Sequence, residues 1–267
     1  MEDPSVVVTP QMTFHWPRSS TPDYTSTFLR AVNGQPSPLR ADRFEYYLRD
    51  YPDRPLVDNV LRGIREGFPI GFTKDRTHYR CPSREYSDTD YDLIIAELER
   101  EVSLGRMAGP FTSLPTTGPY SEFSSTIPTF VIPKKIPGKF RRIEHCSYPP
   151  GASVNDGIDK NDFPVHFASV DSISEAILEC GPDCLVSNYD IQDAYRHVPL
   201  NPADCPLFCF EIRGKYYLQT RAGFGICSLP GLFDTLSYLV AWILLHFTMI
   251  PGYVGSGLRR VEQILDD

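Results

Sequence analysis

The sequence predicts an α+β fold in which helices pack against antiparallel hairpins. Apolar residues recur at helical spacing in residues 55–66 and 91–104, and an almost wholly apolar helix is expected over residues 232–247. Residues 130–143 and 206–220 each hold two short apolar runs joined by a glycine-containing turn, which is typical of a β-hairpin. Helices and hairpins in separate parts of a chain are typical of the α+β class.

Length and composition indicate a globular protein. The chain has 267 residues, of which 41% are hydrophobic, so it can bury a core as one large domain or two small ones. Its formal net charge of -8 argues against a protein that coats nucleic acid with its whole surface, although a local basic patch is compatible with such binding. Seven cysteines without a Cys-x-x-Cys pair indicate reduced thiols.

Neither end of the chain suggests export or membrane insertion. Residues 1–4 lack the basic start and apolar core of a secretory signal. The longest apolar run, residues 236–250, has 15 residues and contains His246, which is short of the ~20 residues that a bilayer needs. We therefore expect a buried helix, no membrane association, and an intracellular protein of the cytoplasm or nucleus.

The first half of the chain is read as packing rather than chemistry. Residues 1–40, rich in Pro, Ser and Thr, predict a poorly ordered arm. Asp53 is expected to cap the helix over residues 55–66, and Asp90 is expected near the start of the helix over residues 91–104. The charged side chains of that second helix predict a solvated face; they are Glu97, Glu99, Arg100 and Glu101.

The hairpin of residues 129–143 has a concentration of positive charge. Five cations fall within nine residues, namely Lys134, Lys135, Lys139, Arg141 and Arg142. In an acidic chain such a cluster indicates either an anionic partner or plain solvation.

The stretch from Val186 to Leu200 carries the strongest chemical signal. A short apolar run from Cys184 leads to Tyr189 and predicts a buried strand, with Asp190 at its end. A carboxylate in that position suits a metal or phosphate site, while the alternative is an Asp that starts a turn or caps a helix. A capping box at Ser172 predicts a short helix packed under this strand.

These motifs, taken together, resemble a known family. Asp-x-x-Asp-Ala-Tyr with a following Val-Pro-Leu, at residues 190–200, resembles the first catalytic motif of reverse transcriptases, and Phe224-Gly225 through Pro230 resembles their second palm motif. The order and spacing resemble the polymerase domain of DIRS-type retroelements over residues 93–250. The resemblance implies right-hand polymerase fingers and a partial palm in residues 111–250, after a helical extension in 41–110 and before a tail in 251–267.

The resemblance also implies roles for individual residues. Asp190 would be the catalytic residue and would bind Mg²⁺ with the carbonyl of Ile191, because Mg²⁺ prefers hard oxygen ligands. Lys134 and Arg141 would grip the triphosphate of an incoming dNTP. The remaining nucleotide-binding residues implied in this way are Asp193 and Ala194 through their amides, Tyr195 as the sugar gate, Phe224 and Gly225. The partners would be dNTP and an RNA or DNA template-primer.

The sequence departs from the family pattern in two places. His145 stands where the family usually has an aspartate, and Tyr253-Val254-Gly255-Ser256 stands near the place of an aromatic-x-Asp-Asp box. Three explanations stay open: an incomplete or decayed copy, a role for Asp266 and Asp267 at the end of the chain, or a hairpin supplied by a partner chain. The expected function is template-directed nucleotidyl transfer, incomplete in this chain; the alternative is a catalytically inactive remnant that binds nucleic acid.

Overall fold

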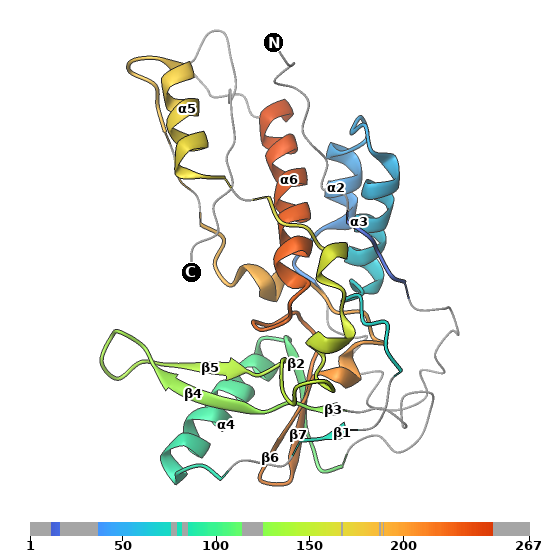
Figure 1. The fold of residues 1–267 in the computed structure, drawn as a ribbon, viewed down its shortest axis with the longest axis vertical. Coiled ribbons are helices and arrows are strands. Elements are labelled where there is room, and N and C mark those ends of the chain that lie inside the picture. The colour runs from blue at the N-terminus through green and yellow to red at the C-terminus, as the bar shows by residue number, and fades with distance from the viewer. Residues whose placement is uncertain are drawn as a thin grey trace.

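The structure, a computed structural model, describes residues 12–16, 37–75, 79–81, 85–113, 125–166, 168–186, 188 and 190–247. It has the predicted α+β class and is elongated, with most helices gathered at one end and the strands at the other (Figure 1). The helical end holds α2 (Ala41–Tyr47), α3 (Arg54–Glu66), α5 (Val170–Cys180) and α6 (Leu229–Phe247), while α4 (Asp88–Ser103) lies at the strand end.

Helix α3 forms as the sequence predicts. The Asp53 carboxylate accepts a hydrogen bond from the Leu56 N–H at 3.0 Å, Pro55 lies in the first turn, and Gly67 follows the last. Its apolar face is buried through Leu56, Val57, Val60, Leu61 and Ile64. Burying each such side chain stabilises the fold by about 1.5–3 kcal/mol, so α3 anchors the helical end.

Helix α4 begins at Asp88 and is capped by Ser87, with Asp90 in its first turn, near the start of the helix as predicted. The Ser87 hydroxyl accepts a hydrogen bond from the Asp90 N–H at 3.1 Å. Ile94 is buried, as the helical spacing predicts, but the prediction of a solvated charged face is wrong at Glu101, which is only 2% exposed.

The strand end is built on two sheets. A five-stranded mixed sheet has the order β1-β3-β6-β7-β2, and a separate pair joins β4 and β5. The strands are β1 (Tyr79–Arg80), β2 (Met107–Phe111), β3 (Ser125–Thr126), β4 (Thr129–Pro133), β5 (Phe140–Glu144), β6 (Cys209–Ile212) and β7 (Lys215–Gln219). The larger sheet takes strands from both sides of the predicted boundary at residue 110. It includes the predicted β6–β7 hairpin, whose turn residues Arg213 and Gly214 both have positive φ.

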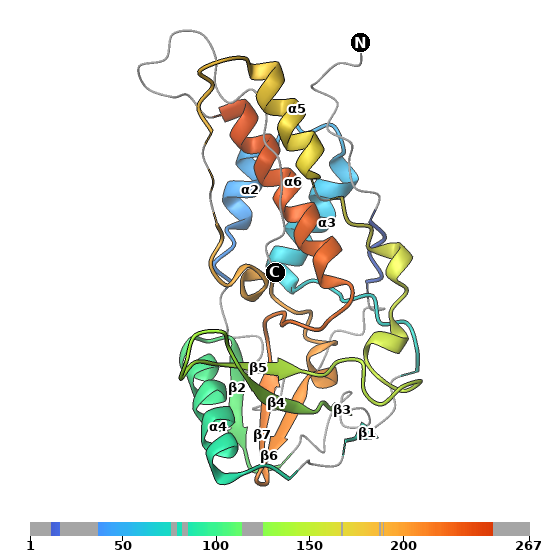
Figure 2. The ribbon, with the colours of Figure 1, turned by 60° about the vertical axis from the view of Figure 1, so that its left-hand side comes forward.

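The β4–β5 hairpin is the predicted cationic one, and it projects to one side of the larger sheet (Figures 1 and 2). Its register pairs Ile132 with Arg141, and the Lys134 N–H donates to the Lys139 carbonyl at 2.8 Å. Because side chains alternate along a strand and directly paired residues share a side, Lys134, Lys139 and Arg141 lie on one face, with Arg142 on the other. The hairpin therefore separates its cations into two sets.

The predicted strand from Cys184 to Tyr189 is wrong for the residues that the structure describes. Residues 184–186 and 188 belong to no strand, and Leu185 and Val186 are 87% and 70% exposed. A strand is stable when a neighbour takes up its backbone hydrogen bonds, and none of the described strands lies beside this run.

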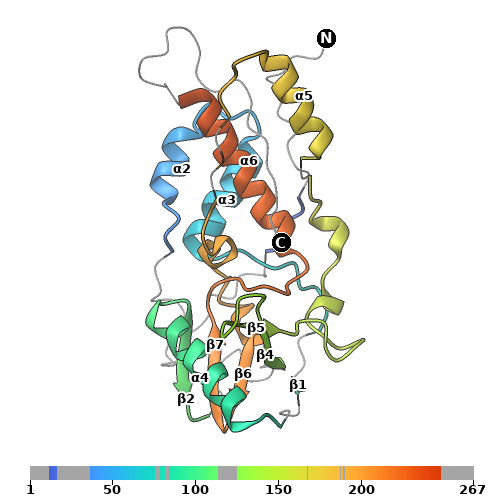
Figure 3. The same ribbon diagram turned by 90° about the vertical axis from the view of Figure 1, so that its left-hand side faces the viewer.

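Helix α5 consequently lacks the surface under which it was expected to pack. It is capped by Ser169 rather than Ser172, and Ala176 is its one buried residue. In Figures 1 and 3, α5 stands to one side of α6.

Helix α6 lies between α5 and the α2–α3 pair in Figures 1 and 3. It buries one face through Leu232, Leu236, Leu239 and Trp242. By length and composition alone it is also a helix that could cross a membrane, and half of its most apolar window is buried within this fold.

Part of the N-terminal arm packs against the helical end. Met12 and Phe14 contact the core, the Trp16 indole N–H donates to Asn59 at 2.8 Å, and the Arg62 guanidinium lies 4.0 Å from the centre of the Trp16 ring. The rest of the arm before residue 37 lies outside the described residues.

Candidate functional site

Asp190 and Ile191 lie on the surface, in the segment that leads from α5 to a 3-10 helix at Ala194–His197, here called the Tyr195 turn. Ile191 is 47% exposed. No ion pair or hydrogen bond joins the Asp190 carboxylate to any of the described residues, so that carboxylate is available to a ligand.

The Tyr195 turn contributes Tyr195 to an aromatic cluster with Phe224 and Phe233. Tyr195 is 9% exposed, and its ring centre lies 5.2 Å from that of Phe224 and 5.6 Å from that of Phe233. Phe224 is 62% exposed and presents an open aromatic face. Burial raises the pKa of the Tyr195 phenol above its ordinary value, so this side chain is neutral at physiological pH. Two of the predicted nucleotide-binding side chains are therefore in contact, at the edge of the core.

Gly225 is required by the fold itself. Its φ is 101°, and a Cβ at this position would lie 2.6 Å from the carbonyl oxygen of Glu144 on β5. Only glycine combines such a backbone with such a close approach. The resemblance implies a nucleotide-binding role for Gly225, whereas in the structure the closest neighbour of this position is the β5 backbone.

Asn155 holds the Phe224–Gly225 loop, a role that the sequence did not reveal. Its side-chain amide donates to the Gly225 carbonyl at 2.7 Å and to the Ser147 hydroxyl at 2.8 Å, and its oxygen accepts the Cys227 N–H at 3.1 Å. The sequence does not reveal this role, because hydrogen bonds between distant loops leave no local pattern.

Replacing Asn155 by alanine is expected to lower the free energy of unfolding by about 1–3 kcal/mol, because the Gly225 carbonyl and the Cys227 N–H would lose their partner. Urea unfolding followed by circular dichroism measures this loss. Asn161 offers a control, since among the described residues its side chain bonds only to nearby Asp159, and its replacement should change stability by a few tenths of a kcal/mol. Equal losses at the two positions would contradict the assigned role of Asn155.

Lys134 and Arg141 share the outward face of the β4–β5 hairpin. Both are exposed, and neither side chain has an ion pair or hydrogen bond among the described residues. Arg142, on the opposite face, stacks 4.8 Å from the Phe210 ring centre and has a side chain only 3% exposed. The structure thus brings together the predicted triphosphate pair and removes Arg142 from the exposed charge cluster. No described contact joins this pair to Asp190.

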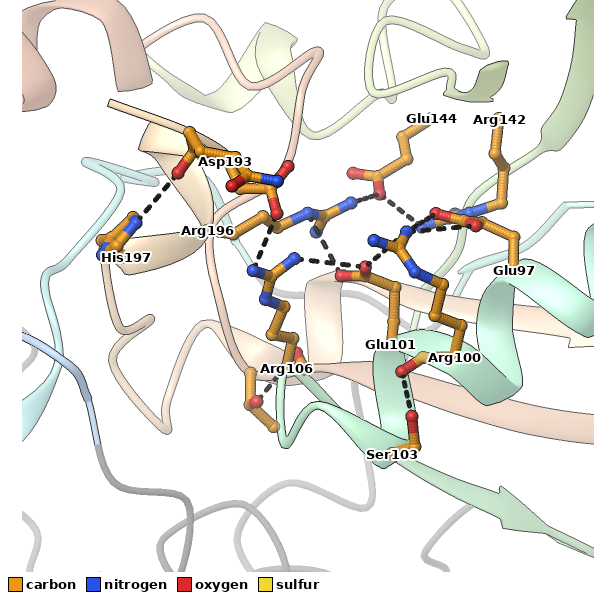
Figure 4. A network of polar contacts seen from close by, with 12 residues as sticks. Glu97, Arg100, Glu101, Ser103, Arg106, Arg142, Glu144, Asp193, Arg196 and His197 are labelled. Carbon is orange, nitrogen blue, oxygen red and sulfur yellow. Dashed lines mark hydrogen bonds and ion pairs between the residues drawn. The ribbon is translucent and has the colours of Figure 1, made fainter. Parts of the chain in front are cut away.

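A network of buried charges lies between the hairpin, α4 and the Tyr195 turn (Figure 4). One oxygen of Glu144 accepts from Arg142 at 2.7 Å and from Arg196 at 2.8 Å. Glu101 lies 3.4 Å from Arg196 and 3.5 Å from Arg106, which in turn binds the Asp193 carboxylate at 2.8 Å. The resemblance implies a role only for the backbone amide of Asp193. In the structure its carboxylate also has a partner, the guanidinium of Arg106.

The electrostatics of Glu144 depend on this network. Burial alone would raise the pKa of its carboxyl, but the guanidiniums of Arg196 and Arg142 hold that pKa below its ordinary value, so Glu144 is ionised. The sequence contained one signal for the network: strand alternation puts Arg142 and Glu144 on the same face, opposite Arg141. The partners from α4 and the Tyr195 turn leave no such signal.

The described residues do not fit a two-metal centre. Among them, no three His, Cys, Asp or Glu side chains converge. Two Mg²⁺ ions in a polymerase are held by a set of carboxylates, and Asp190 with the Ile191 carbonyl supplies one carboxylate. The predicted alternatives Asp266 and Asp267 lie outside the described residues.

No protein-family model matches the chain, and no curated protein matches it.

Proposed function

We propose that the chain is a reverse-transcriptase-like domain with polymerase fingers and a partial palm, and that it binds a nucleoside triphosphate. Template-directed nucleotidyl transfer would need carboxylates beyond those of the described residues. The observation that carries the proposal is the position of Glu144. The β5 strand bearing Arg141, the Tyr195 turn and the Phe224–Gly225 loop all meet at this residue.

The spacing of these parts suits an elongated ligand with one anionic end. Arg141 precedes Glu144 by three residues, so it lies roughly 10 Å away along the strand. At that end Lys134 and Arg141 offer an ammonium and a guanidinium to phosphate oxygens. At the other end Phe224 offers an exposed ring beside Tyr195 for a base or sugar. Asp190, near the Tyr195 turn, is free to meet a cation that accompanies the phosphates.

A catalytically inactive remnant that binds nucleic acid is the second candidate. Two observations favour it. Among the described residues no further carboxylates gather with Asp190 into a metal-binding group, and the β4–β5 hairpin has cations on its outward face. Such a remnant would bind RNA or DNA with a strong salt dependence and would extend no primer.

Changing both Lys134 and Arg141 to alanine is expected to weaken dATP binding on the order of 100-fold, since each charge-assisted contact contributes about 1.5–3 kcal/mol. Isothermal titration of the purified chain with dATP and Mg²⁺ measures this effect. Both residues are exposed, so the melting temperature should stay unchanged. Replacement of Lys215, an exposed cation at the start of β7, serves as a control for net charge.

Primer extension separates the two candidates. With a primed RNA template, dNTPs and Mg²⁺, any extension by the wild-type chain should vanish in Asp190→Asn, which should fold normally. Binding of dATP without extension supports a formed nucleotide site that lacks carboxylates. Salt-dependent nucleic-acid binding without binding of dATP favours the remnant instead, and binding of neither ligand would refute both.

A further inference from the structure

The buried contact between Glu144 and Arg196 joins two parts of the molecule that the proposed function uses separately. Glu144 ends β5, the strand that carries Arg141, and Arg196 follows Tyr195 in the Tyr195 turn. Their charged atoms are 2.8 Å apart, and the side chains are 2% and 11% exposed. Figure 4 shows the Arg196 guanidinium extending from the turn toward Glu144 and Glu101.

Ion pairs fix the Tyr195 turn at both of its ends. Before the turn, the Asp193 carboxylate binds Arg106 at 2.8 Å. Within it, Arg196 binds Glu144 and lies 3.4 Å from Glu101. Asp193 has a φ of 53°, a left-handed backbone that a non-glycine residue adopts at some cost. The turn itself is therefore held by these side chains, while backbone hydrogen bonds anchor the chain directly after it: the Ala222 N–H donates to the Val198 carbonyl at 2.9 Å, and the Leu200 N–H donates to the Thr220 carbonyl at 3.0 Å.

The Phe224–Gly225 loop rests on the other side of Glu144. A Cβ on Gly223 would lie 2.0 Å from a Glu144 carboxylate oxygen, and a Cβ on Gly225 would lie 2.6 Å from the Glu144 carbonyl oxygen. There is no room for this loop to move toward β5. The aromatic end of the proposed site thus has a fixed distance from Glu144, provided that Arg196 keeps the turn against it.

We propose that Arg196 is a positioning residue for nucleotide binding, which holds Tyr195 and Phe224 at the correct distance from the Lys134 and Arg141 cations. The inference rests on the proposed function. Arg196 itself touches no ligand; it acts through Glu144.

A guanidinium is suited to this task for a physical reason. Its planar fork is always charged and reaches two carboxylates at fixed angles, whereas an ammonium on a flexible stem does not fix direction. Buried ion pairs contribute little net stability, and their best-attested use is to specify one arrangement. A ligand that spans both ends of the site needs that arrangement, but a ligand that binds only the cations does not.

The test compares two ligands on the full chain: dATP, which would contact both ends, and inorganic tripolyphosphate, which would contact only the Lys134 and Arg141 end. In Arg196→Met, the Kd for dATP is expected to rise about tenfold or more, while the Kd for tripolyphosphate stays unchanged. Arg196→Lys, which keeps the charge but not the fork, should show the same selective loss and carries the test if Arg196→Met does not fold.

The matched control is Arg142→Met. Arg142 donates to the same Glu144 oxygen from a side chain that is also buried, 3% exposed against 11% for Arg196, but it does not reach the Tyr195 turn. This variant should lose stability without changing the ratio of the two dissociation constants. Hydrogen exchange gives an independent readout: amides of residues 193–198 should exchange faster in Arg196→Lys, with β4 and β5 still protected.

Four results would overturn the inference. An equal loss of affinity for both ligands would show that Arg196 only stabilises the fold, as would the same selective loss in Arg142→Met. Unchanged exchange at residues 193–198 would show that Arg196 does not fix the turn. If the wild-type chain binds tripolyphosphate but not dATP, the proposed function fails at its aromatic end, and the inference fails with it.

Discussion

Replacing Glu144 by alanine is expected to lower the free energy of unfolding by about 3–5 kcal/mol. The change leaves the guanidiniums of Arg142 and Arg196 buried without their carboxylate, and breaking a buried ion pair by removing one partner is strongly destabilising. Denaturant unfolding at neutral pH measures the effect. Removing Glu97, whose side chain is 38% exposed and pairs with Arg100 on the surface, should cost less than about 1 kcal/mol.

The pH dependence of stability gives a second readout for Glu144. Its carboxyl has a lowered pKa in the folded protein, so it binds fewer protons there than in the unfolded chain. Its contribution is complete above the ordinary pKa of 4.5 and is lost as the pH falls below that value through the folded pKa. Glu144→Gln should therefore flatten the acid side of the stability curve. An unchanged slope below pH 4.5 would contradict the assigned ionised state.

Replacing Gly225 by alanine is expected to cost about 2–4 kcal/mol and to weaken dATP binding. The φ of 101° strains any residue with a Cβ, and the added atom would also meet the Glu144 carbonyl oxygen. The loop can relieve this clash only by moving away from β5, which would displace Phe224 from Tyr195. Thermal unfolding and titration with dATP measure the two effects on the same sample.

Gly151 supplies the control for Gly225. Its φ is 83°, yet a Cβ there meets nothing within 4 Å. Gly151→Ala should therefore show the backbone strain alone, about 1–2 kcal/mol, and leave nucleotide binding unchanged. If both alanine variants lost the same stability, the close approach of Gly225 to Glu144 would have no energetic consequence.

The helices and hairpins that the sequence predicted correctly are those whose signals are local. The Asp53 cap, the apolar face of α3 and the Arg213-Gly214 turn each depend on residues within one element or turn. The run from Cys184 to Tyr189 has the composition of a strand, but a strand exists only beside a partner, and composition cannot supply one. The Ser172 cap was wrong for a different reason, because Ser169 was an equally good local candidate.

By itself the sequence determined the α+β class, the two hairpins, and the residue types from which a triphosphate site could be built, because alternation, capping and turn chemistry act between near neighbours. Only the tertiary structure decided that Arg142 is buried while Arg141 is exposed, that Glu101 and Glu144 share the charge of Arg196, and that Gly225 meets β5. These outcomes depend on residues that lie far apart in the sequence. Arg196 and Glu144 are separated by 52 positions, and Asn155 and Gly225 are separated by 70. Burial and ion pairing over such separations are properties of the packed chain, so no local pattern encodes them.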